Sequence, residues 1–248
     1  MALYQAIIAY DGTNFRGFQR QERTRTVQGE IERALKEIGW VGSSIYAAGR
    51  TDAGVHASGQ VVAFELNWKH TRKSLRDAIN DHLPDDVITR HVKEASEGFH
   101  PRYNALLRKY VYRIYCQEVR NPLLDRYAWW VRSALDLKLM KKAADLLVGS
   151  HDFRMFGKPM KKNGNTVRKV ISADWSRLSE EKLFFMICAN AFLYHMVRRL
   201  VFILVRIGQE RILIKDFEDG MTNKYNNLLP GIAPACGLEL TEVVYNEV

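Results

Sequence analysis

Nine consecutive residues, Gly49 to Ala57, carry the side chains of this chain that are best suited to chemistry. They read Gly-Arg-Thr-Asp-Ala-Gly-Val-His-Ala and precede the strand-like run 60–66. Glycines on both sides of an Arg-Thr-Asp unit favour a tight turn whose backbone can approach a ligand closely. An arginine at contact distance favours the ionised form of an aspartate. Asp52 beside Arg50 therefore suits a nucleophile or base better than a general acid, although an isolated Arg-Thr-Asp is more often an ordinary surface turn.

The elements that must position this run follow from the periodicity of apolar residues, which predicts an α+β fold in two halves, 1–105 and 106–248. In the first half we expect strands at 3–10, 60–66 and 86–93, with helices at 26–38 and 71–83. In the second half we expect strands at 110–116, 169–176, 183–189 and 238–245, with helices at 136–149 and 191–207. Strands and helices follow one another in a similar order in both halves, and no Pro-, Gly- or Ser-rich tract separates the halves. This indicates two related halves that are joined directly.

The charge of the chain indicates a polyanionic partner. Its 37 Lys and Arg residues exceed its 28 Asp and Glu residues, which gives a net charge of +9 and an isoelectric point of about 9.5. Nucleic acid is a better partner than a membrane, because no apolar run reaches the roughly 18–20 residues needed to span a bilayer. The N-terminus shows no signal peptide, so we expect a cytoplasmic protein.

The cysteines and glycines do not predict a cofactor or a metal site. The three cysteines, Cys116, Cys188 and Cys236, are widely spaced and are typical of reduced cytosolic thiols. The spacing of Gly12 and Gly17 is that of a phosphate loop, but the lysine and hydroxyl residue that such a loop requires do not follow.

One segment of the second half, Arg154 to Lys169, contains many cations and no acid. A run of charge is usually a solvated surface, but the complete lack of carboxylates favours contact with phosphates. Pro159 and Gly164 would let the segment move onto RNA. The candidate RNA-binding residues within it are Lys158, Lys161, Lys162, Arg168 and Lys169.

The nine-residue run resembles the catalytic signature of the tRNA pseudouridine synthase A family, which it matches from Gly49 to His56 without a substitution. Further runs resemble other motifs of that family in the same order, at 10–21, 99–105 with 108–112, and 190–198. The resemblance implies a pseudouridine synthase fold, with two related halves whose mixed, largely antiparallel sheets join around a catalytic cleft. It also implies a homodimer that isomerises uridine at positions 38, 39 and 40 of the tRNA anticodon stem-loop, without a cofactor.

By this resemblance Asp52 is the essential aspartate, and Arg50 and Arg198 would orient it through their planar forks. Attack at C6, attack at C1′ and removal of a sugar proton are all open to Asp52. Tyr110 would stack on the uracil, since an unstacked base gains about 1–3 kcal/mol from an aromatic face, although most such tyrosines are core residues. Further candidates for RNA binding are Arg16, Gln19, Arg20 and Arg102.

Several alternatives stand beside this interpretation. The charge alone would equally suit a non-catalytic RNA-binding module, and the motifs also fit a synthase of the same family that acts on other uridines. A metal-dependent nuclease is disfavoured, because Asp52 lacks neighbouring carboxylates. We expect Tyr112 to be an ordinary core residue, and His56 and His195 to be structural.

Overall fold

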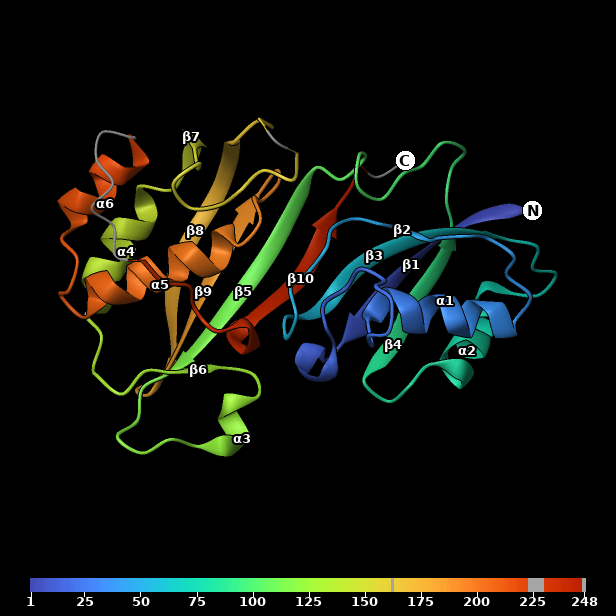
Figure 1. Ribbon diagram of the computed structural model, residues 1–248, viewed down its shortest axis with the longest axis horizontal. Helices are drawn as coiled ribbons and strands as arrows, with labels where there is room; N and C mark the ends of the chain where they lie inside the picture. The colour runs from blue at the N-terminus through green and yellow to red at the C-terminus, as the bar shows by residue number, and fades with distance from the viewer. Residues whose placement is uncertain (162, 223–229, 247–248) are drawn as a thin grey trace. The chain divides into compact units, whose positions relative to one another are not determined.

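The computed structural model describes residues 1–161, 163–222 and 230–246 (Figure 1). The chain folds into two compact units. Unit 1 contains Met1–Leu106 and Glu239–Val248, and unit 2 contains Leu107–Leu238. The last residues of the chain thus group with the first unit, whereas the sequence interpretation kept 106–248 together. Both units combine helices with a sheet, as predicted for an α+β fold. Among the described residues no helix is long and apolar enough to cross a membrane.

The sheet of unit 1 has the strand order β4-β1-β3-β10, and β2 also pairs with β3. Its strands are β1 (Ala2–Tyr10), β2 (Tyr46–Ala47), β3 (His56–Leu66), β4 (Val87–Glu94) and β10 (Leu238–Val244). Strand β1 is antiparallel to both β3 and β4, while β10 runs parallel to β3 beside His56 and Ala57. Gly59 permits this close approach, because a Cβ there would lie 2.1 Å from the carbonyl oxygen of Thr241.

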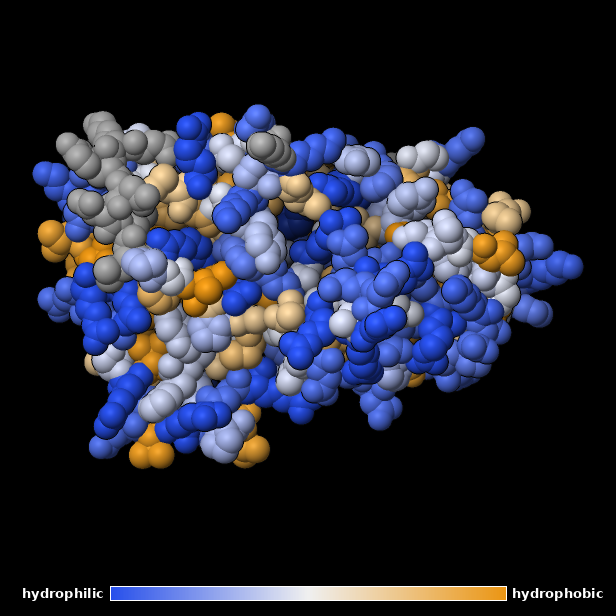
Figure 2. Space-filling model, viewed as in Figure 1, coloured by the Kyte–Doolittle hydropathy of each residue, from blue (hydrophilic) through white to orange (hydrophobic). Residues whose placement is uncertain are grey.

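Two helices of unit 1, α1 (Val27–Glu37) and α2 (Arg72–His82), confirm the predicted ones. The hydroxyls of Thr26 and Thr71 cap them by accepting the N–H of Gly29 and of Ser74. Each helix buries an apolar stripe on one face, and burial of one such side chain contributes about 1.5–3 kcal/mol. The buried stripe residues are Val27, Ile31 and Leu35 of α1 and Leu75 and Ile79 of α2. Figure 2 shows hydrophilic residues over the side of unit 1 that carries α1.

The sheet of unit 2 has the strand order β5-β9-β8-β7, all antiparallel where the pairs are described, and β6 runs parallel to β5. Its strands are β5 (Leu107–Tyr115), β6 (Trp129–Trp130), β7 (Gly149–Asp152), β8 (Val167–Ser179) and β9 (Lys182–Ala189). Its helices are α3 (Pro122–Asp125), α4 (Leu137–Asp145), α5 (Met196–Gly208) and α6 (Ile214–Met221). Short 3-10 turns occupy Gly12–Asn14 in unit 1 and Ala235–Gly237 in unit 2.

Two helix boundaries in unit 2 differ from the predicted ones. Helix α4 ends at Asp145 rather than at Gly149, whose φ of 117° instead lets the chain turn into β7. Helix α5 begins at Met196 rather than at residue 191. The side chain of Asn190 accepts the N–H of Ala191, and His195 has a left-handed φ of 65°, so residues 191–195 leave the helical path.

Candidate active site

The run 49–57 forms a loop that leads into β3, and buried polar side chains hold it from within unit 1. The hydroxyl of Tyr10 on β1 lies 2.7 Å from that of Thr51, which is 8% exposed. The amide of Gln60 on β3 donates to the carbonyl oxygen of Gly49 at 3.1 Å. Burial raises the pKa of Tyr10 to about 12, so the phenol keeps its proton at neutral pH. These bonds fix the backbone on both sides of Arg50.

The chain after β1 packs directly against this loop and forms its floor. Phe18 donates its N–H to the carbonyl oxygen of Thr51 at 3.1 Å. Gly17 has a φ of 94°, and a Cβ there would lie 3.1 Å from the same oxygen. A Cβ on Gly12 would lie only 2.0 Å from the carbonyl oxygen of Val55. The two glycines that resemble a phosphate loop in the sequence therefore let two segments of the chain approach each other.

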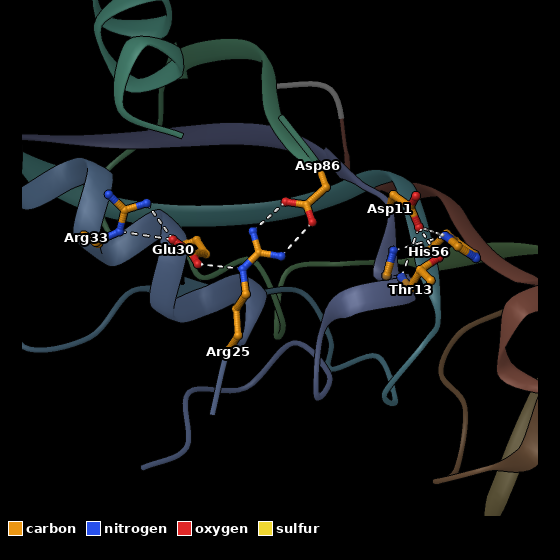
Figure 3. A network of polar contacts seen from close by, with 8 residues as sticks. Asp11, Thr13, Arg25, Glu30, Arg33, His56 and Asp86 are labelled. Atoms are coloured by element: carbon orange, nitrogen blue, oxygen red, sulfur yellow. Dashed lines mark hydrogen bonds and ion pairs between the residues drawn. The ribbon is translucent and has the colours of Figure 1, made fainter. Parts of the chain in front are cut away.

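His56 joins the same two segments (Figure 3). It is buried, and its Nδ1 accepts the N–H of Gly12 at 3.1 Å. The carboxylate of Asp11 also lies 3.1 Å from Nδ1, but this nitrogen cannot both accept from Gly12 and donate to Asp11. We favour the bond from Gly12, whose hydrogen has a fixed position, and the carboxylate of Asp11 accepts from Thr13 instead. The contacts agree with the structural role expected of His56.

A second polar cluster in Figure 3 stabilises the segment between residue 21 and the start of α1. Arg25 donates two hydrogen bonds to the carboxylate of Asp86, at 2.7 and 2.8 Å, and a third to Glu30 at 3.0 Å. Its guanidinium lies 4.3 Å from the ring centre of Phe15. The hydrogen bonds to Asp86 raise the pKa of Arg25 above its usual value. Sequence reasoning missed this arginine, because its partner lies 61 residues away.

Arg50 and Asp52 lie on the loop of unit 1. Arg50 is exposed and Asp52 is half-buried, and the carbonyl oxygen of Asp52 accepts the N–H of Val55 at 3.2 Å, which closes the turn. The expected contact between the two side chains stays a prediction.

Tyr110 and Arg198 lie in unit 2. The half-buried ring of Tyr110 on β5 meets Phe192 edge to face, with the ring centres 5.1 Å apart. The Nε of Arg198, in the first turn of α5, donates to the carbonyl oxygen of Ala233 at 2.8 Å. Both side chains are thus held by contacts within their own unit, and their grouping with Asp52 stays a prediction.

One tyrosine and one histidine that we expected to be structural, Tyr112 and His195, lie in unit 2. Tyr112 is completely buried and donates to the carbonyl oxygen of Pro234 at 2.7 Å, and burial raises the pKa of its phenol. His195 is the residue before α5, and its ring stacks on Tyr194 with the centres 3.6 Å apart. Tyr112 therefore belongs to the core, as predicted.

The candidate RNA-binding residues of unit 1 differ in their surroundings. Arg16, Gln19 and Arg102 are exposed, and the guanidinium of Arg102 lies 5.9 Å from the ring centre of Tyr103. Arg20 is exposed too, but its guanidinium binds the buried carboxylate of Glu32 at 2.5 Å. Arg20 therefore neutralises a charge beneath the surface, whatever else it contacts.

The basic segment 154–169 of unit 2 is attached to its surroundings rather than forming one free loop. Lys158 pairs with Tyr194 through two backbone hydrogen bonds, of 3.2 and 3.0 Å. Lys169 lies in β8, and its N–H donates to the side chain of Asn190 at 3.0 Å. A Cβ on Gly157 would lie 2.7 Å from the Cβ of Leu193, so this glycine allows the close approach. The movement expected of the segment stays a prediction.

The described lysines of this segment are nevertheless exposed. Lys158, Lys161 and Lys169 are exposed, whereas Arg168 on β8 is half-buried and donates to the carbonyl oxygen of Val167 at 2.7 Å. Burial lowers the pKa of Arg168. Lys162 lies outside the described residues.

The three cysteines, Cys116, Cys188 and Cys236, are free thiols. Within 1–161, 163–222 and 230–246, no group of three or more His, Cys, Asp or Glu side chains is arranged to hold a metal ion.

Known proteins resemble this chain over its whole length. A family model described as tRNA pseudouridine synthase matches residues 6–104 and 143–246. A protein named tRNA pseudouridine synthase A from Thermotoga sp. (strain RQ2) is 39% identical over 241 residues, which are 97% of this chain and 98% of that protein. A protein of the same name from Streptococcus equi subsp. equi (strain 4047) is 39% identical over 249 residues, which are 100% of both.

A solved structure of an archaeal box H/ACA sRNP Nop10-Cbf5 complex also matches. The match covers 83% of this chain and 52% of that one, at 11% identity and with a TM-score of 0.33.

Proposed function

Because the chain belongs to the tRNA pseudouridine synthase family, we propose that it isomerises uridine to pseudouridine at positions 38, 39 and 40 of the tRNA anticodon stem-loop. The observation that carries the proposal is the loop around Asp52, which matches the family signature and is held by Tyr10, Phe18 and Gln60. A catalytic carboxylate needs such support, because small displacements from the productive geometry reduce the rate strongly.

The reaction breaks the N1–C1′ glycosidic bond, turns the uracil and forms a C5–C1′ bond. A proton leaves C5 and another is taken up at N1, so atoms balance and no electrons are imported. The enzyme must supply an anionic group near the sugar and the base, a surface that holds the detached uracil, and a proton acceptor.

We assign these tasks to four side chains. Asp52 is the anionic group, by attack at C6, by attack at C1′ or by removal of a sugar proton. Arg50 and Arg198 orient its carboxylate, since a guanidinium fork binds two oxygens at once. Tyr110 stacks on the uracil, and the edge contact with Phe192 sets the plane of its ring.

The target nucleotide must leave its stack, which costs a few kcal/mol. Phosphate contacts from exposed cations would offset this cost without reading the sequence. We assign the contacts to Arg16, Gln19, Arg20 and Arg102 in unit 1 and to the basic segment of unit 2. A homodimer in the cytoplasm completes the proposal, and sedimentation should give twice the 28.7 kDa mass of the chain.

Release of tritium from 5-tritiated uridine in tRNA tests the function, with a gel-shift titration of the same tRNA beside it. We expect release by the wild-type protein in excess EDTA and without nucleotide. Asp52→Asn keeps the size of the side chain but removes its charge, so release should fall by about 10⁴-fold or more while binding persists. Substantial release by Asp52→Asn would refute the assignment, and binding without any release by the wild type would leave only an RNA-binding module.

A further inference from the structure

The described part of unit 1 contains a pocket of about 220 Å³ between α2 and β4. Its lining consists of four residues with basic side chains and one apolar residue, namely Arg72, Lys73, Arg76, His91 and Val92. None of the four basic residues belongs to the run 49–57 or to the basic segment of unit 2. A concave surface with this lining attracts anions.

The walls of the pocket are held in place by the packing of α2 on the sheet. Leu75 and Ile79 of α2 are completely buried or nearly so. Asn80 at the end of α2 donates to the carbonyl oxygen of Thr89 on β4 at 3.0 Å and accepts the N–H of the same residue at 2.7 Å. The helix and the strand therefore form a fixed frame for the basic side chains.

An irregularity in β4 brings His91 to the surface. In the pairing with β1, Thr89 faces Ile8 and His91 faces Ile7, so Arg90 is left without a partner in the ladder. The buried residues of β4 on either side are Thr89 and Val92, three positions apart, and His91 between them is exposed. A bulge of this kind redirects side chains and is common near functional sites.

The basic side chains at the pocket are largely without acidic partners among the described residues. Arg72, Lys73 and His91 are exposed, and their side chains make no hydrogen bond or ion pair with the described residues. Arg76 binds the neighbouring residue Asp77, with its Nη2 2.6 Å from Oδ1 of the carboxylate. The stretch 67–76 contains no Asp or Glu at all.

We propose that this pocket between α2 and β4 binds phosphate groups of an RNA backbone. Arginine forks match the two non-bridging oxygens of a phosphodiester, and lysine adds charge without a fixed direction. Only the identity of the RNA as tRNA rests on the proposed function. Strand β1 separates β4 from β3, which places the pocket about 10 Å across the sheet from the strand that follows the Asp52 loop. The bound phosphate therefore belongs to a nucleotide other than the target.

The test compares two double variants with the same loss of charge, both in the Asp52→Asn background so that binding is measured without turnover. R72Q/K73Q removes two cations at the pocket, and R33Q/K36Q removes two exposed cations from α1. We expect R72Q/K73Q to weaken the binding of full-length tRNA about tenfold and to reduce the slope of log K against log salt by about two. The control should change both much less, and R72K/K73R should bind like the parent.

Equal losses in the pocket and α1 variants would show a general effect of charge and would overturn the proposal. A loss by R72K/K73R as large as that of R72Q/K73Q would also overturn it, because two cations then remain at the pocket. Titration of the parent with inorganic phosphate gives the third comparison. Phosphate binding that R72Q/K73Q abolishes, with tRNA affinity unchanged, would mean that the pocket holds a free anion rather than RNA. Failure of the proposed function would appear separately, as absent tritium release by a wild-type protein that still binds tRNA.

Discussion

The Asp52 loop and the basic segment 154–169 both expose polar side chains, but their support differs. The loop is held by buried partners on two strands, Tyr10 and Gln60, and by the backbone of Phe18. The segment is attached through hydrogen bonds to Tyr194 and Asn190, while Lys158, Lys161 and Lys169 are exposed to solvent. A reacting group requires a fixed position, whereas a phosphate contact needs only charge within reach. The difference in support thus matches the difference in proposed tasks.

A glycine-to-alanine substitution in each region should give the largest difference in stability between the two regions. In Gly12→Ala the new Cβ would lie 2.0 Å from the carbonyl oxygen of Val55, so the floor of the loop must shift. In Gly164→Ala the nearest atoms are 3.0 Å away, which a small adjustment relieves. We expect Gly12→Ala to lower the free energy of unfolding by about 3 kcal/mol or more and to abolish most tritium release, and Gly164→Ala to cost under about 1 kcal/mol. Urea denaturation measures both, and similar losses would contradict the comparison.

Removing the hydrogen bond between Tyr10 and Thr51 should affect turnover more than binding. Tyr10→Phe and Thr51→Val each delete one hydroxyl, and each should cost about 1–2 kcal/mol of stability. With Asp52 less well positioned, we expect kcat to fall about tenfold or more while KM stays nearly constant. The double variant should lose little beyond either single one, because both remove the same bond. Fully additive losses would mean that the two hydroxyls act independently.

Neutralising the exposed lysines of the basic segment should produce the opposite pattern. In a variant with glutamine at Lys158, Lys161 and Lys169, we expect tRNA binding to weaken about tenfold and the salt slope to fall by about three. The kcat should stay within about twofold, since these side chains are assigned no part in the chemistry. Single-turnover rates at saturating enzyme, measured beside the binding titration, separate the two effects. A large loss of the single-turnover rate would place this segment in the catalytic machinery.

The stability of the protein should also respond to high pH, and only part of this response falls within the pH range that is measured. Burial raises the pKa of Tyr10 to about 12 in the folded protein, against about 10 in the unfolded chain. Below pH 10 both states keep the proton, and between about pH 10 and 12 only the unfolded state loses it. The contribution of Tyr10 to the free energy of unfolding is therefore lost as the pH rises, by up to about 2–3 kcal/mol. Urea denaturation from pH 9 to 11 should show a shallower decline for Tyr10→Phe than for the wild type, and parallel declines would argue against this burial effect.

Local signals in the sequence predicted most helices and strands of both units. The apolar periodicity of α1 and α2 was sufficient, because the pattern of each lies within one helix. The prediction was wrong at the start of α5 and the end of α4. Apolar residues at 191–193 read as helix, but the side chain of Asn190 binds the backbone of Lys169, 21 residues away. Periodicity contains no information about such a distant partner.

The site was predictable only in part, for the same reason. The run 49–57 marked Asp52 by its composition, but nothing in that run indicates that Tyr10 binds Thr51, 41 residues away. Gly12 and Gly17 were noticed for a spacing that suits phosphate, and the structure gives them a packing role instead. The basic residues of the stretch 67–76 were not predicted to form a site. They line a pocket together with His91 on β4, which the local sequence does not indicate.

The pairing of β10 with β3 has a consequence for synthesis of the protein on the ribosome. Residues 1–106 emerge first, but the strand that covers the start of β3, beside His56 and Ala57, emerges only after all of unit 2. At about 5–20 residues per second the delay is on the order of ten seconds, which is long compared with the folding of most small domains. During this interval the start of β3, next to the Asp52 loop, lacks the β10 partner that it has in the complete fold. The edge of β3 beside the Asp52 loop is thereby completed only after β10 has been synthesised.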